Sequence, residues 1–101
     1  MKKLMIPMFQ TAVYLYSPRE KAEYEKAYNV VPDYVTGQAN GNGVWVASDD
    51  NETVLHECIH LCDWLIYKRL AIDATDSITE LRAYITEYLF SEYTKYLKSK
   101  S

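Results

Sequence analysis

Hydrophobic and polar residues follow different patterns in the two halves of the chain. Before Ser17, the runs LMIPMF and TAVYLY are rich in residues that favour strands, so we expect one or two short strands there. Farther on, DYVTGQA and GVWVAS flank the segment from Asn40 to Gly43, whose asparagines and glycines tolerate the positive φ of tight turns. This arrangement predicts an antiparallel hairpin.

A helix is predicted between these strand-like segments. Ser17 can cap it, with Pro18 at the first helical position and Glu20 reaching back to complete a capping box. The helix should run to about Asn29, because Pro32 prevents its continuation. The residues that we expect this segment to bury are Tyr24, Ala27, Tyr28 and Val31.

The second half of the chain has the apolar period of two longer helices. The acidic run DDNE supplies capping residues and negative charge at the start of the first, which should extend from Thr53 to about Leu70. The second should begin near Asp76 or Ser77 and run to about Lys98, with lysines near its end. The apolar residues of the first helix form one broad face: Val54, Leu55, Cys58, Ile59, Leu61, Cys62, Leu65 and Ile66.

Together these elements predict an α+β fold. A small, mostly antiparallel sheet from the first half of the chain would pack against the helix that follows it and against a long C-terminal helix. A chain of 101 residues, of which 49% are hydrophobic and 25% charged, is long enough for one modest core. No repeats or linkers interrupt it, so we expect a single domain spanning residues 1–101.

The charge and the cysteines of the chain indicate which kinds of partner and which cellular compartment to expect. The formal net charge is −3 and no stripe of lysine and arginine is visible, so we expect no nucleic acid partner. Pro7 and Gln10 interrupt the short apolar run at the N-terminus, and no run is long enough to span a bilayer. Cys58 and Cys62 lie four residues apart on one predicted helix, which is poor geometry for a disulfide. We therefore expect a cytoplasmic protein with no membrane partner.

The strongest chemical signal is HECIH at positions 56–60, which matches the H-E-x-x-H pattern. On a helix, His56 and His60 lie on nearly the same side, so their imidazoles can bind one ion. Glu57 lies about 100° around the helix from His56, where a general base for a metal-bound water belongs. Zinc suits two imidazoles and an oxygen donor, so the motif predicts a zinc site.

A third protein ligand is expected on the last helix. We favour Glu80, because that helix can return antiparallel to the first and present its opening turn near the ion. The same carboxylate can instead complete a capping box with Ser77 in the run SITE. The other acidic candidates are Asp63, Asp73, Asp76 and Glu87, of which Asp63 better fits a partner that orients an imidazole.

Two alternatives arise from the same residues. The first is a structural zinc site with mixed ligands, in which Cys58 and Cys62 join the histidines. Around the helix, however, the two cysteines lie about 160° to 200° from the midline between the histidines, so they should point into the core. The histidines and Glu57 can also be an ordinary solvated helix face without a metal.

The motif is followed by the run ELRAY, which begins with Glu80. In this arrangement the chain resembles the zincin metallopeptidases, and more narrowly the gluzincins, in which a downstream Glu on a second helix completes the site. It is also similar to compact phage-encoded HExxH proteins that are classed as candidate peptidases. The resemblance implies that His56, His60 and Glu80 bind zinc while Glu57 activates water. In larger zincins an edge strand holds the substrate, and the segment 43–48 is the candidate here.

These observations predict zinc-dependent hydrolysis of peptide bonds in a peptide or protein substrate, in the host cytoplasm if the chain is phage-encoded. Glu57 would move a proton from water to the departing amine. Tyr84, one turn after Glu80, could stabilise the oxyanion, but as an aromatic residue at core spacing we expect it to pack. One rival is a catalytically inactive binding or inhibitory protein that uses zinc for folding, and a second is an interaction module without a metal. The sequence leaves the oligomeric state open.

Overall fold

The described part of the chain contains four strands and three helices. The computed structural model describes residues 1–7, 9–70 and 76–100, without the side chains of 69, 70 and 76–78. The strands are β1 (Lys2–Ile6), β2 (Thr11–Tyr16), β3 (Gly37–Asn40) and β4 (Gly43–Val46). The helices are α1 (Lys21–Ala27), α2 (Asn51–Leu65) and α3 (Asp76–Lys100), with a 3-10 turn η1 (Pro18–Glu20) before α1 and a π-helical segment η2 (Ile66–Leu70) after α2. None of the helices within these ranges is long and apolar enough to cross a bilayer.

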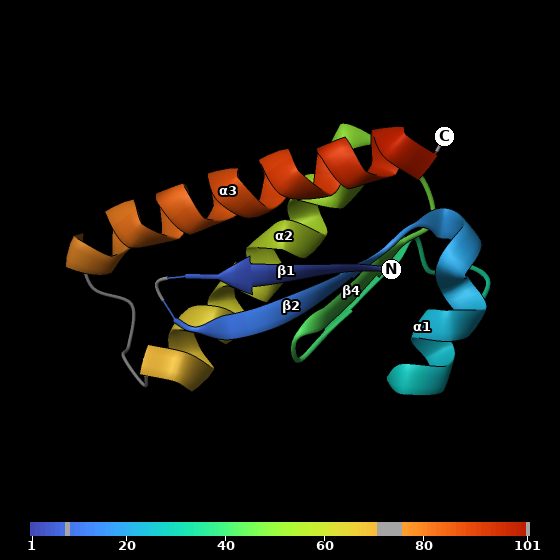
Figure 1. The fold of residues 1–101 in the computed structure, drawn as a ribbon, viewed down its shortest axis with the longest axis horizontal. Helices are drawn as coiled ribbons and strands as arrows, with labels where there is room; N and C mark the ends of the chain where they lie inside the picture. The colour runs from blue at the N-terminus through green and yellow to red at the C-terminus, as the bar shows by residue number, and fades with distance from the viewer. Residues whose placement is uncertain (8, 71–75, 101) are drawn as a thin grey trace.

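The strands form one mixed sheet in the order β1-β2-β4-β3 (Figure 1). β1 pairs antiparallel with β2, and β3 pairs antiparallel with β4, whereas β2 and β4 are parallel. Parallel neighbours need a long connection, which the segment containing α1 and β3 supplies. The predicted α+β fold is therefore confirmed, with its mostly antiparallel sheet, the helix that carries HECIH and the long C-terminal helix.

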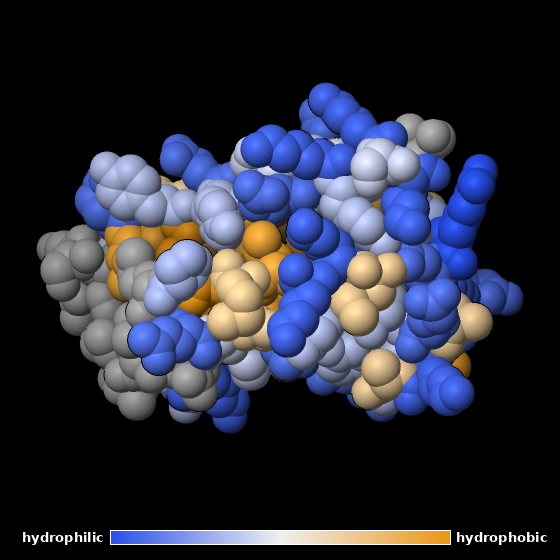
Figure 2. All heavy atoms as spheres, viewed as in Figure 1, coloured by the Kyte–Doolittle hydropathy of each residue, from blue (hydrophilic) through white to orange (hydrophobic). Residues whose placement is uncertain are grey.

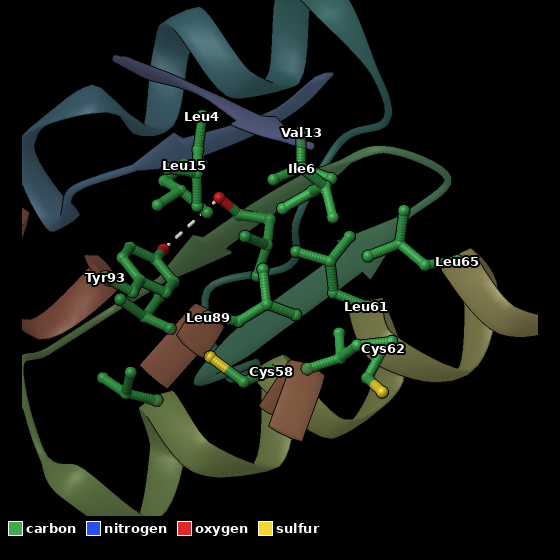
Figure 3. Close-up of a cluster of buried hydrophobic side chains, with 14 of the residues drawn as sticks. Leu4, Ile6, Val13, Leu15, Cys58, Leu61, Cys62, Leu65, Leu89 and Tyr93 are labelled. Carbon is green, nitrogen blue, oxygen red and sulfur yellow. Dashed lines mark hydrogen bonds between the residues drawn. The ribbon is translucent and has the colours of Figure 1, made fainter. Parts of the chain in front are cut away.

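Successive side chains along the strands point to opposite faces of the sheet, and both faces are buried. On β4, Val44 and Val46 join the main core with α2 and α3, while Trp45 between them joins a second cluster with Tyr24 of α1. In Figure 3, side chains of β1 and β2 meet those of α2 and α3 in the main core. Figure 2 shows hydrophobic atoms between α3 and β1, whereas the outer side of α3 is mostly hydrophilic. The sheet thus carries α2 and α3 on one face and α1 on the other.

The predicted hairpin forms around a two-residue loop. Asn40 and Gly43 pair across β3 and β4. Gly41 opens the loop with φ +59°, a conformation that glycine adopts without steric cost. The turn therefore brings β3 back along β4 and leaves β3 at the edge of the sheet.

Side chains at the starts of two helices behave as the sequence predicts. The Ser17 backbone N–H donates to Oε1 of Glu20 at 2.8 Å, which is one half of the expected capping box. Asp50 precedes α2, and its Oδ2 accepts from the Thr53 backbone N–H at 3.2 Å. These local bonds fix where η1 and α2 begin.

The helix ends differ from prediction in two places. α1 ends at Ala27 rather than Asn29, and regular α-helix in α2 ends at Leu65, after which the chain continues as the π-helical η2 to Leu70. α3 begins at Asp76, as expected, and extends to Lys100. Neither difference moves the HECIH segment, which lies in the middle of α2.

The burial of three predicted core residues is wrong. Tyr24 and Val31 are buried, but Ala27 is exposed on the outer side of the short α1. Leu55 and Ile59 are 42% and 40% exposed, because they lie on the flank of α2 that α3 covers only in part. They line a groove of about 700 Å³ between α2 and α3.

Glu20 joins the start of the chain, η1 and α3. Its carboxylate forms an ion pair with the Met1 ammonium group and accepts hydrogen bonds from the Ser17 backbone N–H and from the Tyr96 hydroxyl, the latter at 2.6 Å. Burial by itself would raise the pKa of Glu20, but these bonds outweigh burial and lower the pKa to about 2. The ionised form of Glu20 therefore stabilises the fold.

We expect Glu20→Gln to lower the free energy of unfolding at neutral pH by about 2 kcal/mol. The folded pKa lies below the usual value of 4.5, so the contribution is present above that pH and is lost as the pH falls towards about 2. Urea denaturation between pH 7 and pH 2 would show a smaller loss of stability in the variant. The exposed Glu23 on α1 offers a matched control, Glu23→Gln. Equal acid sensitivity of Glu20→Gln and the wild type would contradict the assignment.

Candidate metal and catalytic site

The two histidines lie side by side on the exposed edge of α2. His56 Nε2 and His60 Nε2 are 3.2 Å apart, and the rings meet at 76°. Two nitrogen ligands of a tetrahedral zinc, each at about 2.0 to 2.1 Å from it, are separated by about 3.3 Å. The spacing of the two imidazole nitrogens therefore fits one zinc ion, although a metal-free pair can also share a hydrogen bond at this distance.

Glu57 is buried beside this pair. It is 6% exposed, although His56 directly before it is exposed. Burial raises the pKa of Glu57, and the charges of His56 and His60 oppose the increase. A buried carboxylate with a raised pKa is a stronger proton acceptor than an exposed one, which suits a general base.

Gly37 of β3 makes the space that Glu57 occupies. A Cβ at position 37 would lie 2.8 Å from Oε2 of Glu57 and 2.9 Å from its Cγ. The carboxylate therefore lies directly against the backbone of the edge strand. Sequence reasoning did not single out Gly37, although a glycine within a strand-like run is a known sign of close approach.

We expect Gly37→Ala to displace the Glu57 carboxylate and to lower the free energy of unfolding by about 1 to 3 kcal/mol, as overpacking does. The same substitution in a Glu57→Ala background should cost much less, because the added methyl group then meets a space. Thermal unfolding of the four chains gives the interaction energy. Equal costs in the two backgrounds would show that Gly37 is required for another reason.

A cleft runs between α2 and the outer edge of β3, and we call it the edge cleft. One part, of about 460 Å³, is lined by residues from Tyr34 to Gly37 and by the first turns of α2. The other, of about 400 Å³, is lined by Gly37 to Ala39, Gly41, His60 and Trp64. Gly37, His56 and Glu57 line both parts. The candidate chemical groups therefore lie at the middle of the cleft.

The edge of β3 offers unpaired backbone groups to this cleft. Asn40 and Gly43 flank the two-residue loop, and the Ala47 backbone N–H donates to the Thr36 carbonyl at 2.8 Å. Because bonding alternates along an antiparallel strand, Gly37 points its N–H and C=O away from β4. The N–H and C=O of Ala39, two residues farther along, also point away from β4.

The prediction that the segment 43–48 holds the substrate is therefore wrong. β4 pairs with β2 on one side and with β3 on the other, so it has no free edge. The strand that borders HECIH with a free edge is β3, which precedes β4 in the hairpin.

Comparisons with protein-family models, curated proteins and solved structures found no match. Among the described residues, no group of three or more His, Cys, Asp or Glu side chains is placed to hold a metal.

The structure brings His56, Glu57 and His60 together but does not bring Glu80 to them. Glu80 is exposed near the start of α3, and the side chain of Ser77, its possible capping partner, lies outside the described part. Its assignment as the third ligand stays a prediction.

The other acidic candidates are differently placed. Asp63 forms an ion pair with Arg82 of α3, with Oδ1 and Nη2 2.7 Å apart. Glu87 lines the groove between α2 and α3, whereas Asp73 and the side chain of Asp76 lie outside the described residues. Asp63 therefore ties α2 to α3, and nothing places it against a histidine.

The cysteines and Tyr84 have no part in the edge cleft. Cys58 and Cys62 are buried in the main core, as predicted, and burial raises the pKa of the Cys58 thiol to about 12. Their position disfavours the mixed His and Cys zinc site. Tyr84 is 65% exposed, so the expectation that it packs into the core is wrong.

Proposed function

We propose that this chain is a zinc-dependent metallopeptidase that hydrolyses peptide bonds with Glu57 as the general base. The observation that carries the proposal is the pair of imidazole nitrogens 3.2 Å apart beside a buried glutamate. That these groups open onto a cleft along a free strand edge adds support. The predicted ligands remain His56, His60 and Glu80.

Each group has a role in the proposed reaction. Zinc, when bound, would polarise the scissile carbonyl and acidify water. Glu57 would accept a proton from the attacking water on its carboxylate and deliver that proton to the amine nitrogen as the C–N bond breaks. Gly37 has no side chain, and it would therefore leave free the space that the Glu57 carboxylate occupies. The imidazoles, being exposed, leave the approach to substrate open.

The substrate would bind as an added strand. Gly37 and Ala39 offer outward N–H and C=O groups, which pair with an extended peptide in the way a further strand of the sheet would. A folded segment cannot present such an edge, so we propose unfolded or loop segments as substrates. The edge cleft would keep the peptide backbone beside Glu57.

The alternative function, an inactive binding protein that zinc stabilises, requires a different arrangement of metal ligands. His56 and His60 belong to one helix, so a metal bound by these two alone joins no separate elements. A large stabilising effect of zinc requires a ligand from another element, such as Glu80 of α3. Among the described residues, the core between the sheet and the helices includes none of the proposed ligands His56, His60 and Glu80.

Zinc binding measured on the untagged wild type, on His60→Ala and on Glu80→Ala tests the proposal. We expect one zinc per wild-type chain, none in His60→Ala, and at least roughly tenfold weaker binding in Glu80→Ala, as follows from the loss of a ligand. Glu87→Ala, on the same helix, serves as the control. The wild type should also cleave an unfolded protein such as reduced casein, and chelation should stop this. Zinc-loaded protein without turnover would favour the inactive rival, and absence of zinc binding would remove both.

A further inference from the structure

Trp64 lies on the same side of α2 as the proposed chemical groups. It follows His60 by four residues and Glu57 by seven, both of which are near-integral numbers of helical turns. Its side chain is half-buried, packs against the main core and lines the 400 Å³ part of the edge cleft. Ala39 and Gly41 of the β3 hairpin line the same part of the cleft.

The strand and the helix run along the cleft in the same direction. The start of α2, with Thr53, lines the cleft together with Thr36, whereas Trp64 lines it together with Gly41. Successive positions on β3 can therefore be matched with successive turns of α2. Gly37 lies at Glu57, and Ala39 lies one turn farther along, towards His60 and Trp64.

A peptide that adds to β3 would place every second side chain on the α2 side of the sheet. The side chain that faces Gly37 would lie beside Glu57, next to the reacting bond. The next one on that side would lie opposite Ala39 and against Trp64. This spacing follows from the strand period alone, so it holds for either direction of the peptide.

We infer that Trp64 and Ala39 form a subsite for a large apolar or aromatic side chain of the substrate, an inference that rests on the proposed peptidase function. The indole lines this part of the cleft with an apolar ring, and Ala39, which also lines it, has only a methyl side chain. Among the described lining residues of this part of the cleft, the ionisable groups are His56, Glu57 and His60, none of which lies beyond Trp64. A charged substrate side chain would therefore find no opposite charge at the far end.

The test measures peptide binding to Glu57→Gln protein, with and without added zinc, so that no peptide is cleaved. The probes are blocked alanine hexapeptides in which one residue, at each position in turn, is Phe, Lys or Ala. We expect the Phe series to contain one position at which binding is about tenfold tighter than for the all-Ala peptide, as burial of an aromatic ring provides. Lys at that position should bind no tighter than Ala.

Substitutions at the subsite decide the assignment. Trp64→Ala should remove the preference for Phe, and Trp64→Phe should keep most of it. Ala39→Leu should also remove the preference by filling the subsite while Trp64 stays, which covers the case in which Trp64→Ala fails to fold. A preference for Phe that survives both Trp64→Ala and Ala39→Leu would overturn the inference, as would a preference for Lys.

Failure of the subsite and failure of the peptidase proposal give different results. Peptides that bind the parent without any residue preference, while the wild type cleaves casein, would overturn the subsite alone. A preference that depends on Trp64, in a protein that cleaves nothing, would support the subsite as a peptide-binding groove and overturn the peptidase function. Absence of binding by every peptide would overturn the subsite.

Discussion

Glu57→Gln should lower kcat/KM for peptide hydrolysis by about 10³-fold while leaving zinc bound. General acid–base groups typically contribute 10²- to 10⁴-fold, and an amide cannot accept the proton. Glutamine has the same shape as glutamate, so it should fit the space over Gly37 that a larger residue would not. Because burial disfavours the charged carboxylate, the neutral amide should leave the fold as stable as the wild type or slightly more so.

The measurement combines turnover of an unfolded protein substrate with zinc titration and thermal unfolding of the same samples. Glu52→Gln is the matched control, since Glu52 lines the edge cleft in the first turn of α2 but is exposed. We expect near wild-type turnover from the control. Hydrolysis by Glu57→Gln within tenfold of the wild type would exclude Glu57 as the general base, and loss of zinc would show that the carboxylate is a ligand instead.

Interactions between residues that are close in sequence explain why the helix and the hairpin that border the site could be predicted. Asp50 caps α2 through a bond to a residue three positions later, and the HECIH spacing puts two imidazoles on one helix side whatever surrounds the helix. The hairpin turn at Gly41 depends likewise on adjacent residues. Such interactions span a few residues, so the sequence carries them in one short run.

The errors come from contacts between distant segments. Which strand of the hairpin is the free edge depends on Tyr14 pairing with Gly43, a parallel pairing that no local pattern encodes. The exposure of Leu55 and Ile59 depends on how much of α2 the later helix covers. Gly37 and Trp64 were overlooked for the same reason, because their importance lies in what they face across the cleft.

Tyr93 shows how the long C-terminal helix is held on the sheet. Its ring is fully buried in the main core (Figure 3). Its hydroxyl donates to the Tyr16 carbonyl at 2.5 Å, with the Val44 carbonyl at 3.3 Å. Tyr16 ends β2 and Val44 lies in β4, so one side chain of α3 bonds to the two parallel strands at the centre of the sheet. Burial raises the pKa of Tyr93 well above its usual value, so the hydroxyl remains a donor at every working pH.

Tyr93→Ala should therefore lower the free energy of unfolding by about 3 to 5 kcal/mol, because it removes a buried ring and leaves a cavity between α3 and the sheet. Tyr93→Phe keeps the ring and should cost about 1 to 3 kcal/mol, since buried carbonyls lose their donor. Urea denaturation measures both, with Tyr88→Phe, on a more exposed part of α3, as the control. If Tyr93→Phe cost no more than the control, the hydroxyl would not be what joins α3 to β2 and β4. The larger loss in Tyr93→Ala should also loosen the packing of α3 on α2, and so weaken zinc binding if Glu80 is a ligand, whereas Tyr93→Phe should leave zinc affinity unchanged.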